Sequence, residues 1–218
     1  MLLRGRGVLL RDLEPADGDR LADLTALDRP WRRTNGPYFG QPSRAELADD
    51  DRRFRELAGT DHARLPDPRS MLAICAPGTA AESGPGADSE GGPGAAVLIG
   101  LVSWYWESHV TDWRRMGIAI HDEAYWGRGL GTEAMALWTS YLFDHTDALR
   151  LDFATYSGNP GMIAVGRRLG FVEEGRYRRA RRWAGGVHDA VVMGVLREEW
   201  DELRGRWPFT PEASGRRP

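Results

Sequence analysis

The chain has 218 residues, of which 41% are hydrophobic and 10% aromatic, and its formal net charge is −3. This length suits one well-buried domain and is short for two. No apolar run approaches the roughly 20 residues that a membrane span needs, so we expect no membrane partner. The small negative charge gives the whole molecule no long-range attraction for nucleic acid or anionic lipid. Residues 1–4 do not begin a secretory signal, and we therefore expect a cytoplasmic location.

The first third of the chain predicts alternating strand and helix segments. Ser43 with Glu46 forms a capping-box pattern, and Gly59 can end the helix that follows it. In chain order we expect a strand at 8–11, a helix after Asp17 with Leu21, Leu24 and Leu27 on one face, an aromatic loop at 30–42, and a helix at 43–59.

Two strands are predicted next, at 70–76 and 96–106. Between them, residues 77–95 hold six Gly and three Pro and no bulky apolar side chain, which indicates a mobile connection. Cys75, the single cysteine, lies in the first of these apolar runs. An internal disulfide is excluded, and a buried, inert thiol is favoured over a catalytic one.

The remaining pattern alternates helix and strand. We expect a strand at 116–121, a helix at 132–143, and a strand at 149–155, where apolar and polar residues alternate. Asn159 caps a further helix with Pro160 at its first position and Gly170 as its stop. Strands at 171–174 and 187–196 and a short helix near 196–203 follow. We therefore predict a single domain at 1–205 with a flexible insert at 77–95, and a flexible tail at 206–218.

A glycine-rich turn between the strand at 116–121 and the next helix is the strongest functional signal. The first N–H groups of a helix lack internal partners, so this arrangement favours an anion, and glycines at 127, 129 and 131 let phosphate oxygens approach the backbone. The segment from Gly129 to Ala134 also fits the dinucleotide pattern G-x-G-x-x-A. Against that alternative, five residues separate strand from glycines and fewer than 90 remain to complete a doubly wound sheet. Glycines that merely permit a sharp turn remain a third interpretation.

The run from Met116 to Ala134, MGIAIHDEAYWGRGLGTEA, closely resembles the core of the GNAT superfamily of N-acetyltransferases, in particular its branch of ribosomal-protein N-terminal acetyltransferases. Further matches follow in order: Asn159, the RLGF at 168–171, the EEGR at 173–176, and the segments 189–193 and 196–200. The resemblance covers roughly residues 8–203, strongly after Val97 and loosely before it.

This resemblance implies an α/β fold with a mixed, mostly antiparallel sheet of about seven strands, flanked by helices and splayed at its central strand. It also implies acetyl-CoA, or another acyl-CoA, as co-substrate, and no metal. The implied cofactor-binding residues are Ile118, Ala119 and Ile120 for the pantetheine arm, Gly127, Arg128, Gly129, Leu130, Gly131 and Thr132 for the pyrophosphate, and Asn159, which can equally be a plain helix cap.

The sequence departs from the family where acid and base groups often stand. Arg115 replaces a frequent Glu, Gly166 a frequent Tyr, and Met162 a frequent Ser. Deprotonation by another carboxylate through water, catalysis mainly by positioning, and lost chemistry all remain open. The candidate catalytic residues are Glu107, Tyr156 and Ser157, with Asp112 and His121 as further replacements.

Five arginines between Arg176 and Arg182 form the densest basic segment. This segment can meet an acidic acceptor, cofactor phosphates or tRNA, or it can be a solvated hairpin. The leading hypothesis is acyl transfer from acyl-CoA to a primary amine of a small molecule or a protein N-terminus, by a monomer or homodimer. The alternatives are amide formation from aminoacyl-tRNA and a non-catalytic acyl-CoA-binding regulator.

Overall fold

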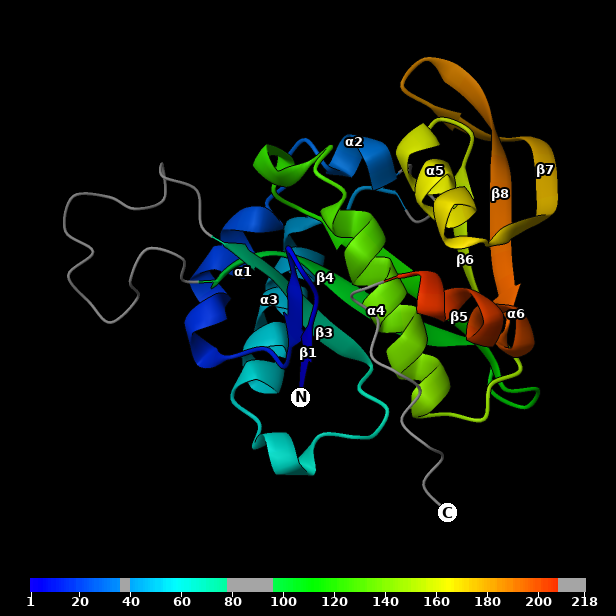
Figure 1. The fold of residues 1–218 in the computed structure, drawn as a ribbon. Helices are drawn as coiled ribbons and strands as arrows, with labels where there is room; N and C mark the ends of the chain where they lie inside the picture. The colour runs from blue at the N-terminus through cyan, green and yellow to red at the C-terminus, as the bar shows by residue number, and fades with distance from the viewer. Residues whose placement is uncertain (36–39, 78–95, 208–218) are drawn as a thin grey trace.

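The computed structural model describes residues 1–35, 40–77 and 96–207. Three ranges lie outside the described residues: 36–39 in the expected aromatic loop, 78–95 in the expected insert, and the tail at 208–218. The fold is α/β, with one open sheet of eight strands in the order β1-β2-β3-β4-β5-β6-β8-β7 (Figure 1). Among the described residues, no helix is long and apolar enough to cross a membrane.

The first half of the sheet is antiparallel throughout. It consists of β1 (Leu2–Arg4), β2 (Leu9–Arg11), β3 (Met71–Pro77), β4 (Ala96–Ser108) and β5 (Trp113–Ile120). The connection from β2 to β3 carries α1 (Gly18–Leu24), α2 (Arg32–Asn35) and α3 (Arg44–Ala58). The capping box at the start of α3 is formed, since Ser43 Oγ accepts from Glu46 N at 3.2 Å and Glu46 Oε2 accepts from Ser43 N at 2.7 Å.

The second half begins with a parallel crossover. From β5 the chain passes through α4 (Leu130–Asp144) to β6 (Arg150–Tyr156), which runs parallel to β5. It then forms α5 (Pro160–Leu169), the antiparallel strands β7 (Val172–Trp183) and β8 (Gly186–Leu196), and α6 (Arg197–Leu203).

Helices cover the two faces of the sheet unequally. The larger core lies between the sheet and α4, α5 and α6, and it contains Trp138, Phe153 and Trp200, which are buried. The smaller core lies on the opposite face, where α1 and α3 pack on β2, β3 and β4 through Leu21, Leu24 and their neighbours. Figure 1 shows α4, α5 and α6 on the near side of the sheet and α1 and α3 behind it.

The sheet is splayed between β5 and β6. These parallel strands pair at only two positions, Arg114 with Leu151 and Arg115 with Asp152. Towards their C-terminal ends the strands diverge, and the cleft that opens between them is the space in which the candidate site lies. The splay that the family resemblance implied is confirmed.

Several predicted boundaries differ from the structure. The strand count is eight because β1 pairs with β2 in an N-terminal hairpin that the sequence pattern did not predict. Leu27 is exposed because α1 already ends at Leu24. The expected loop at 30–42 contains α2. The strand expected at 171–174 extends to Trp183, because the arginine-rich segment pairs with β8 across two bulges.

Candidate active site

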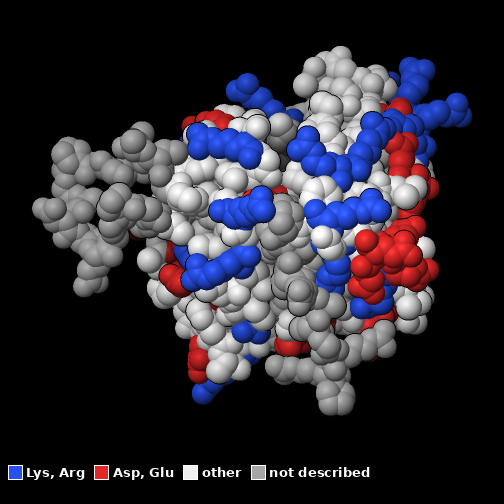
Figure 2. Space-filling view, viewed as in Figure 1, with Lys and Arg blue, Asp and Glu red and all other residues white. Residues whose placement is uncertain are grey.

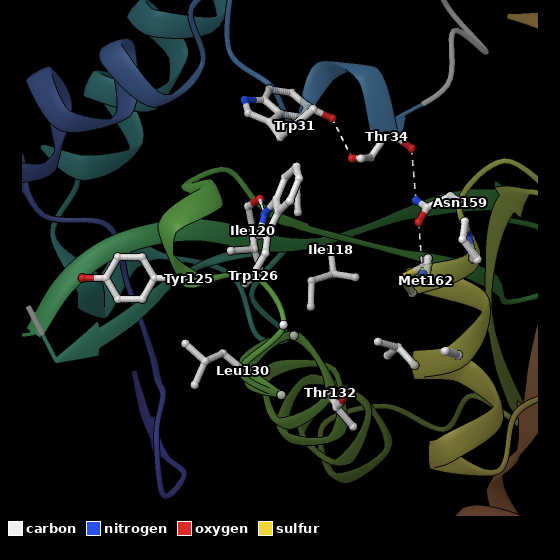
Figure 3. A pocket seen from close by; sticks show the side chains of 18 of the residues that line it. Trp31, Thr34, Ile118, Ile120, Tyr125, Trp126, Leu130, Thr132, Asn159 and Met162 are labelled. Atoms are coloured by element: carbon white, nitrogen blue, oxygen red, sulfur yellow. Dashed lines mark hydrogen bonds between the residues drawn. The ribbon is translucent and has the colours of Figure 1, made fainter. Parts of the chain in front are cut away.

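A pocket of about 590 Å³ lies at the C-terminal end of β5, where β5 has diverged from β6. Its walls come from the end of β5, the first turn of α4, the start of α5, and the segment around α2. In Figure 3, Ile118 and Ile120 lie in the middle of this space, Leu130 and Thr132 lie on α4, and Trp31 and Thr34 lie on the opposite side. Of the ten predicted cofactor-binding residues, all except Arg128 line the pocket.

The glycine turn leads directly into α4. Gly127 and Gly129 have φ values of +73° and +81°, a left-handed conformation that L side chains rarely adopt, and a Cβ at either position would meet nothing within 4 Å. Gly129 is the residue that precedes the helix, and it provides no side-chain cap. The backbone of the turn therefore faces open space in the pocket instead of protein.

The first N–H groups of α4 are available to a ligand. Thr132 N and Glu133 N donate to Gly129 O at 3.0 and 3.1 Å. Within the described part of the chain, no acceptor is found for the N–H groups of Leu130 and Gly131. Unpaired N–H groups at the positive end of a helix dipole are a suitable environment for a phosphate or pyrophosphate.

The edge of β5 that faces the cleft carries a second set of backbone groups. His121 N donates to Ile99 O on β4 at 2.8 Å. Backbone groups of successive residues point to opposite edges of a strand, so those of Ile118 and Ile120 point away from β4 into the cleft. Trp126 Nε1 already donates to Ile120 O at 2.9 Å. The groups of Ile118 are consequently the better placed to pair with an extended amide-containing chain.

Asn159 connects the start of α5 to α2. Its Oδ1 accepts from Met162 N at 3.1 Å, which is the helix cap, and its Nδ2 donates to Thr34 O at 3.0 Å (Figure 3). The predicted cap is confirmed, while a contact with the cofactor stays a prediction. Thr34 was not predicted as a pocket residue, because no local sequence pattern indicates that α2 lies beside the pocket, whereas the aromatic loop that contains Trp31 was already a candidate substrate wall.

Basic side chains surround the mouth of the pocket. Figure 2 shows them over the β1–β2 turn, over the segment that leads into α4, and over α5, while acidic side chains gather over α6. Arg168 lines the pocket, and the Arg128 guanidinium lies over the ring of Tyr125, 5.1 Å from its centroid. The β1–β2 turn is fixed against α4 because Gly7 N donates to Glu133 Oε1 at 3.0 Å. This distribution of charge suits an anionic ligand.

The three predicted catalytic residues do not lie together. Glu107 is at the end of β4, where its Oε2 lies 2.7 Å from Arg115 Nη1. Tyr156 and Ser157 lie at the far end of β6. The Tyr156 hydroxyl donates to Arg33 O at 3.2 Å, and Ser157 Oγ accepts from Asp189 N at 3.0 Å. Both hydroxyls thus have structural partners, whereas Glu107 faces the solvent with a third of its side chain exposed.

The two further replacements, Asp112 and His121, differ in environment. Asp112 forms an ion pair with Arg114 in the β4–β5 turn. His121 is buried against Trp31, with ring centroids 4.5 Å apart, and its Nδ1 has no partner among the described residues. Burial, with a smaller effect of Arg32, lowers the pKa of His121 to about 4. Its imidazole is therefore neutral at pH 7.

The other departures from the family pattern have clear structural settings. Arg115 binds the buried carboxylate of Asp152, with Nε 2.7 Å from Oδ1. Met162 lines the pocket. A Cβ at Gly166 would lie 2.7 Å from Phe153 Cζ and 2.9 Å from Met193 Sδ, so this position faces the core and has no room for a larger residue.

Cys75 is remote from the cleft. It is completely buried in the smaller core, beside Leu13 and Leu98. Burial raises the pKa of its thiol to about 11, so almost no thiolate exists at pH 7. The interpretation of Cys75 as a structural thiol is confirmed. No group of metal-ligating side chains occurs in the described ranges.

Splayed parallel strands, a glycine turn at a helix N-terminus and a basic pocket mouth are the features that the family resemblance led us to expect of an acyl-CoA-dependent acyltransferase. Residues 8–172 match the model of the acetyltransferase (GNAT) domain family. The match spans most of the chain, which therefore belongs to this family and is an acyl-CoA-dependent N-acyltransferase.

Three known proteins illustrate the similarity. YdaF of Bacillus subtilis, which its name assigns provisionally to ribosomal N-acetylation, is 28% identical over 89% of this chain and 93% of its own. The structure of RimL, a ribosomal L7/L12 α-N-protein acetyltransferase in complex with coenzyme A, covers 90% of this chain and 98% of its own, with a TM-score of 0.63 and 16% identity. The spermidine N-acetyltransferase of Vibrio cholerae covers 89% and 98%, with a TM-score of 0.62 and 15% identity. The two structures share the fold.

Proposed function

We propose that this protein transfers an acetyl group from acetyl-CoA to a primary amine, either of a small molecule or of a protein N-terminus, and that Glu107 receives the proton of the amine. The observation that carries the proposal is the continuous path from the N-terminus of α4 along the cleft edge of β5. Pyrophosphate on the N–H groups of Leu130 and Gly131 would direct the pantetheine arm along Ile118.

The direction of this path sets the position of the chemistry. A strand rises about 3.3 Å per residue, so the paired residue Arg115 lies about 17 Å along β5 from Ile120. An extended pantetheine arm with its phosphates at α4 carries its thioester towards this closed end of the cleft. Of the three predicted catalytic residues, Glu107 is the one next to the closed end, since its carboxylate contacts Arg115.

The proposed acceptors are based in part on the similar proteins. YdaF and RimL bear names that point to ribosomal proteins, and the Vibrio cholerae enzyme acts on spermidine. A protein N-terminus and spermidine both carry a primary amine, and the proposal retains this chemical group. The exposed arginines of β7, Arg178, Arg179 and Arg182, favour an acceptor with negative charge over a polyamine.

Calorimetric titration with acetyl-CoA, followed by an assay of thiol release over amines and N-terminal peptides, tests the proposal. We expect micromolar binding and release of coenzyme A with at least one amine. No binding at high micromolar acetyl-CoA would refute the proposed donor. Binding without thiol release would favour a regulator that only senses acyl-CoA.

The arginine-rich strand also permits a different donor, aminoacyl-tRNA, since Arg178, Arg179 and Arg182 are exposed. Transfer of a labelled aminoacyl group from charged tRNA, in the absence of acetyl-CoA, would favour this function. We expect no transfer from charged tRNA.

Size-exclusion chromatography with light scattering determines in the same preparation whether the protein is a monomer or a homodimer.

A further inference from the structure

The closed end of the cleft is marked by an ion pair between the two splayed strands. Arg115 of β5 and Asp152 of β6 form the last paired position before the strands diverge. The guanidinium contacts both carboxylate oxygens, with Nε 2.7 Å from Oδ1 and Nη2 3.3 Å from Oδ2. We call Glu107, Trp113, Arg115 and Asp152 the vertex cluster, because they meet where the two strands meet.

Asp152 serves as an anchor in this cluster. Its side chain is fully buried, and besides Arg115 it accepts from Trp113 Nε1 at 2.6 Å and from Arg150 Nη2 at 3.2 Å. A carboxylate that is bound by three side chains and has no exposed surface is not accessible to a substrate. Its role is to fix the orientation of Arg115, whose planar guanidinium holds its five donors in a rigid fork.

Fixing the fork also fixes Glu107. With Nε and Nη2 directed at Asp152, the remaining nitrogen, Nη1, lies 2.7 Å from Glu107 Oε2. This contact is an ion pair, and it involves only one of the two Glu107 oxygens. A third of the Glu107 side chain is exposed, so the carboxylate is accessible from the solvent, although Glu107 itself does not line the pocket.

We propose that Arg115 is a positioning residue that holds the Glu107 carboxylate at the closed end of the cleft to receive the acceptor amine. This inference rests on the proposed function. The amine nitrogen attacks the thioester carbonyl, the C–N bond forms and the C–S bond breaks. The amine proton passes to Glu107, directly or through water, and the departing coenzyme A thiolate takes up a proton. Glu107, its partner Arg115 and the anchoring Asp152 thus come from three different strands, β4, β5 and β6.

The test compares four single variants by steady-state kinetics with one responsive amine. Glu107→Gln keeps the shape and removes the proton acceptor, so we expect kcat to fall by about 100-fold or more. Arg115→Met releases Glu107 and should lower kcat by about 10-fold, while Arg115→Lys restores part of this loss. The KM for acetyl-CoA should stay within twofold in all three, because the phosphate end of the cleft is unchanged.

Arg150→Met is the matched control. Arg150 contacts the same Asp152 carboxylate, and Glu174 as well, but it does not contact Glu107. We expect wild-type kcat from this variant, even if its thermal midpoint falls. Equal losses of kcat in Arg150→Met and Arg115→Met would show that Arg115 acts only through stability, and would overturn the inference.

A double variant gives an independent readout. If Arg115 acts through Glu107, adding Arg115→Met to Glu107→Gln should lower kcat by less than threefold further, whereas independent roles would multiply the two losses. Because Glu107 is partly exposed, we expect the Glu107→Gln protein to fold even if the Arg115→Met protein does not. A kcat of Glu107→Gln within twofold of the wild-type value would by itself refute the inference. A wild-type protein that binds acetyl-CoA but acetylates no amine would refute the proposed function first.

Discussion

The turn that leads into α4 presents backbone groups to the cleft, whereas the vertex cluster at the other end consists of side chains from three strands. In the turn, left-handed glycines at 127 and 129 expose N–H groups of one continuous segment. In the cluster, Glu107, Arg115 and Asp152 are separated by up to 45 residues in the chain and depend on sheet register to meet.

This difference decides how easily each end of the cleft is recognised in a sequence. A backbone site depends on a short motif of neighbouring residues, so it forms a recognisable pattern. A side-chain site can exchange charges between strands and keep its geometry. Arg115 stands where the family resemblance led us to expect a carboxylate, and a carboxylate on the neighbouring strand, Glu107, lies at its guanidinium.

The largest expected effect concerns the backbone site. Gly129→Val forces a β-branched residue into φ +81° and places a side chain where phosphate oxygens would approach. Loss of two charge-assisted hydrogen bonds should weaken acetyl-CoA binding by about 1,000-fold, or about 4 kcal/mol. Isothermal titration of the folded variant measures this change.

Gly185→Val is the matched control for this variant. Gly185 also has a left-handed φ, +77°, and a Cβ added there would meet nothing within 4 Å, but this residue lies at the β7–β8 turn. The strain of a left-handed φ should lower the unfolding free energy of both variants by about 1–2 kcal/mol, while the Gly185→Val protein binds acetyl-CoA as the wild type does. Equal affinities of the two variants would show that the turn does not contact the cofactor.

The sequence was sufficient for features that depend on a few neighbouring residues. The capping box at Ser43, the Asn159 cap and the glycine turn were all predicted, because each is a local hydrogen-bond or φ requirement. Gly170, predicted as a helix stop, has φ +89°. The splay of the sheet came from the family resemblance and not from any local pattern.

Features that depend on tertiary contact could not be predicted in this way. The pairing of the 12-residue strand β7 with β8 decides its length, although five arginines in seven positions are equally typical of a loop. Trp31 joins the pocket because α2 is held to β6 and α5 by Tyr156 and Asn159. The contact of Glu107 with Arg115 requires a register that a single sequence does not reveal.

The next largest effect is a dependence of stability on pH at His121, which is buried against Trp31. Its pKa is about 4 in the folded state and about 6.5 when unfolded, so the unfolded chain binds more protons between these values. The contribution of His121 to the free energy of unfolding is fully present above pH 6.5. It is lost as the pH falls towards 4, and the loss reaches up to about 3 kcal/mol.

Urea unfolding of wild type and His121→Gln at several pH values from 7 to 4 measures this contribution. The Gln side chain does not titrate, so the difference in unfolding free energy between the two proteins should shrink steadily below pH 6.5. A difference that stays constant down to pH 4 would mean that His121 is protonated in the folded state or becomes exposed there.

A smaller effect is expected at Gly166, which stands where the family resemblance led us to expect Tyr. The experiment asks whether this position accepts a larger residue. The Cβ of Gly166→Ala would come within 3 Å of Phe153 and Met193 atoms, so we expect a loss of about 2 kcal/mol in unfolding free energy. Gly161→Ala on the same helix makes only an ordinary 3.6 Å contact and should be neutral or slightly stabilising. Chemical denaturation compares them, and a Gly166→Ala protein as stable as Gly161→Ala would reopen position 166 as a site for a larger residue.

The smallest effect separates the two functions considered for Asn159. Asn159→Ala removes the cap of α5 and the bond to Thr34 O, and should cost about 1 kcal/mol of stability. Asn159→Asp keeps an acceptor for Met162 N but loses the donor to Thr34. If Asn159 is only a cap, the Asp variant is the more stable of the two, and both bind acetyl-CoA within threefold of wild type. A larger loss of affinity in both variants, with the cap retained in one, would assign the amide to the cofactor.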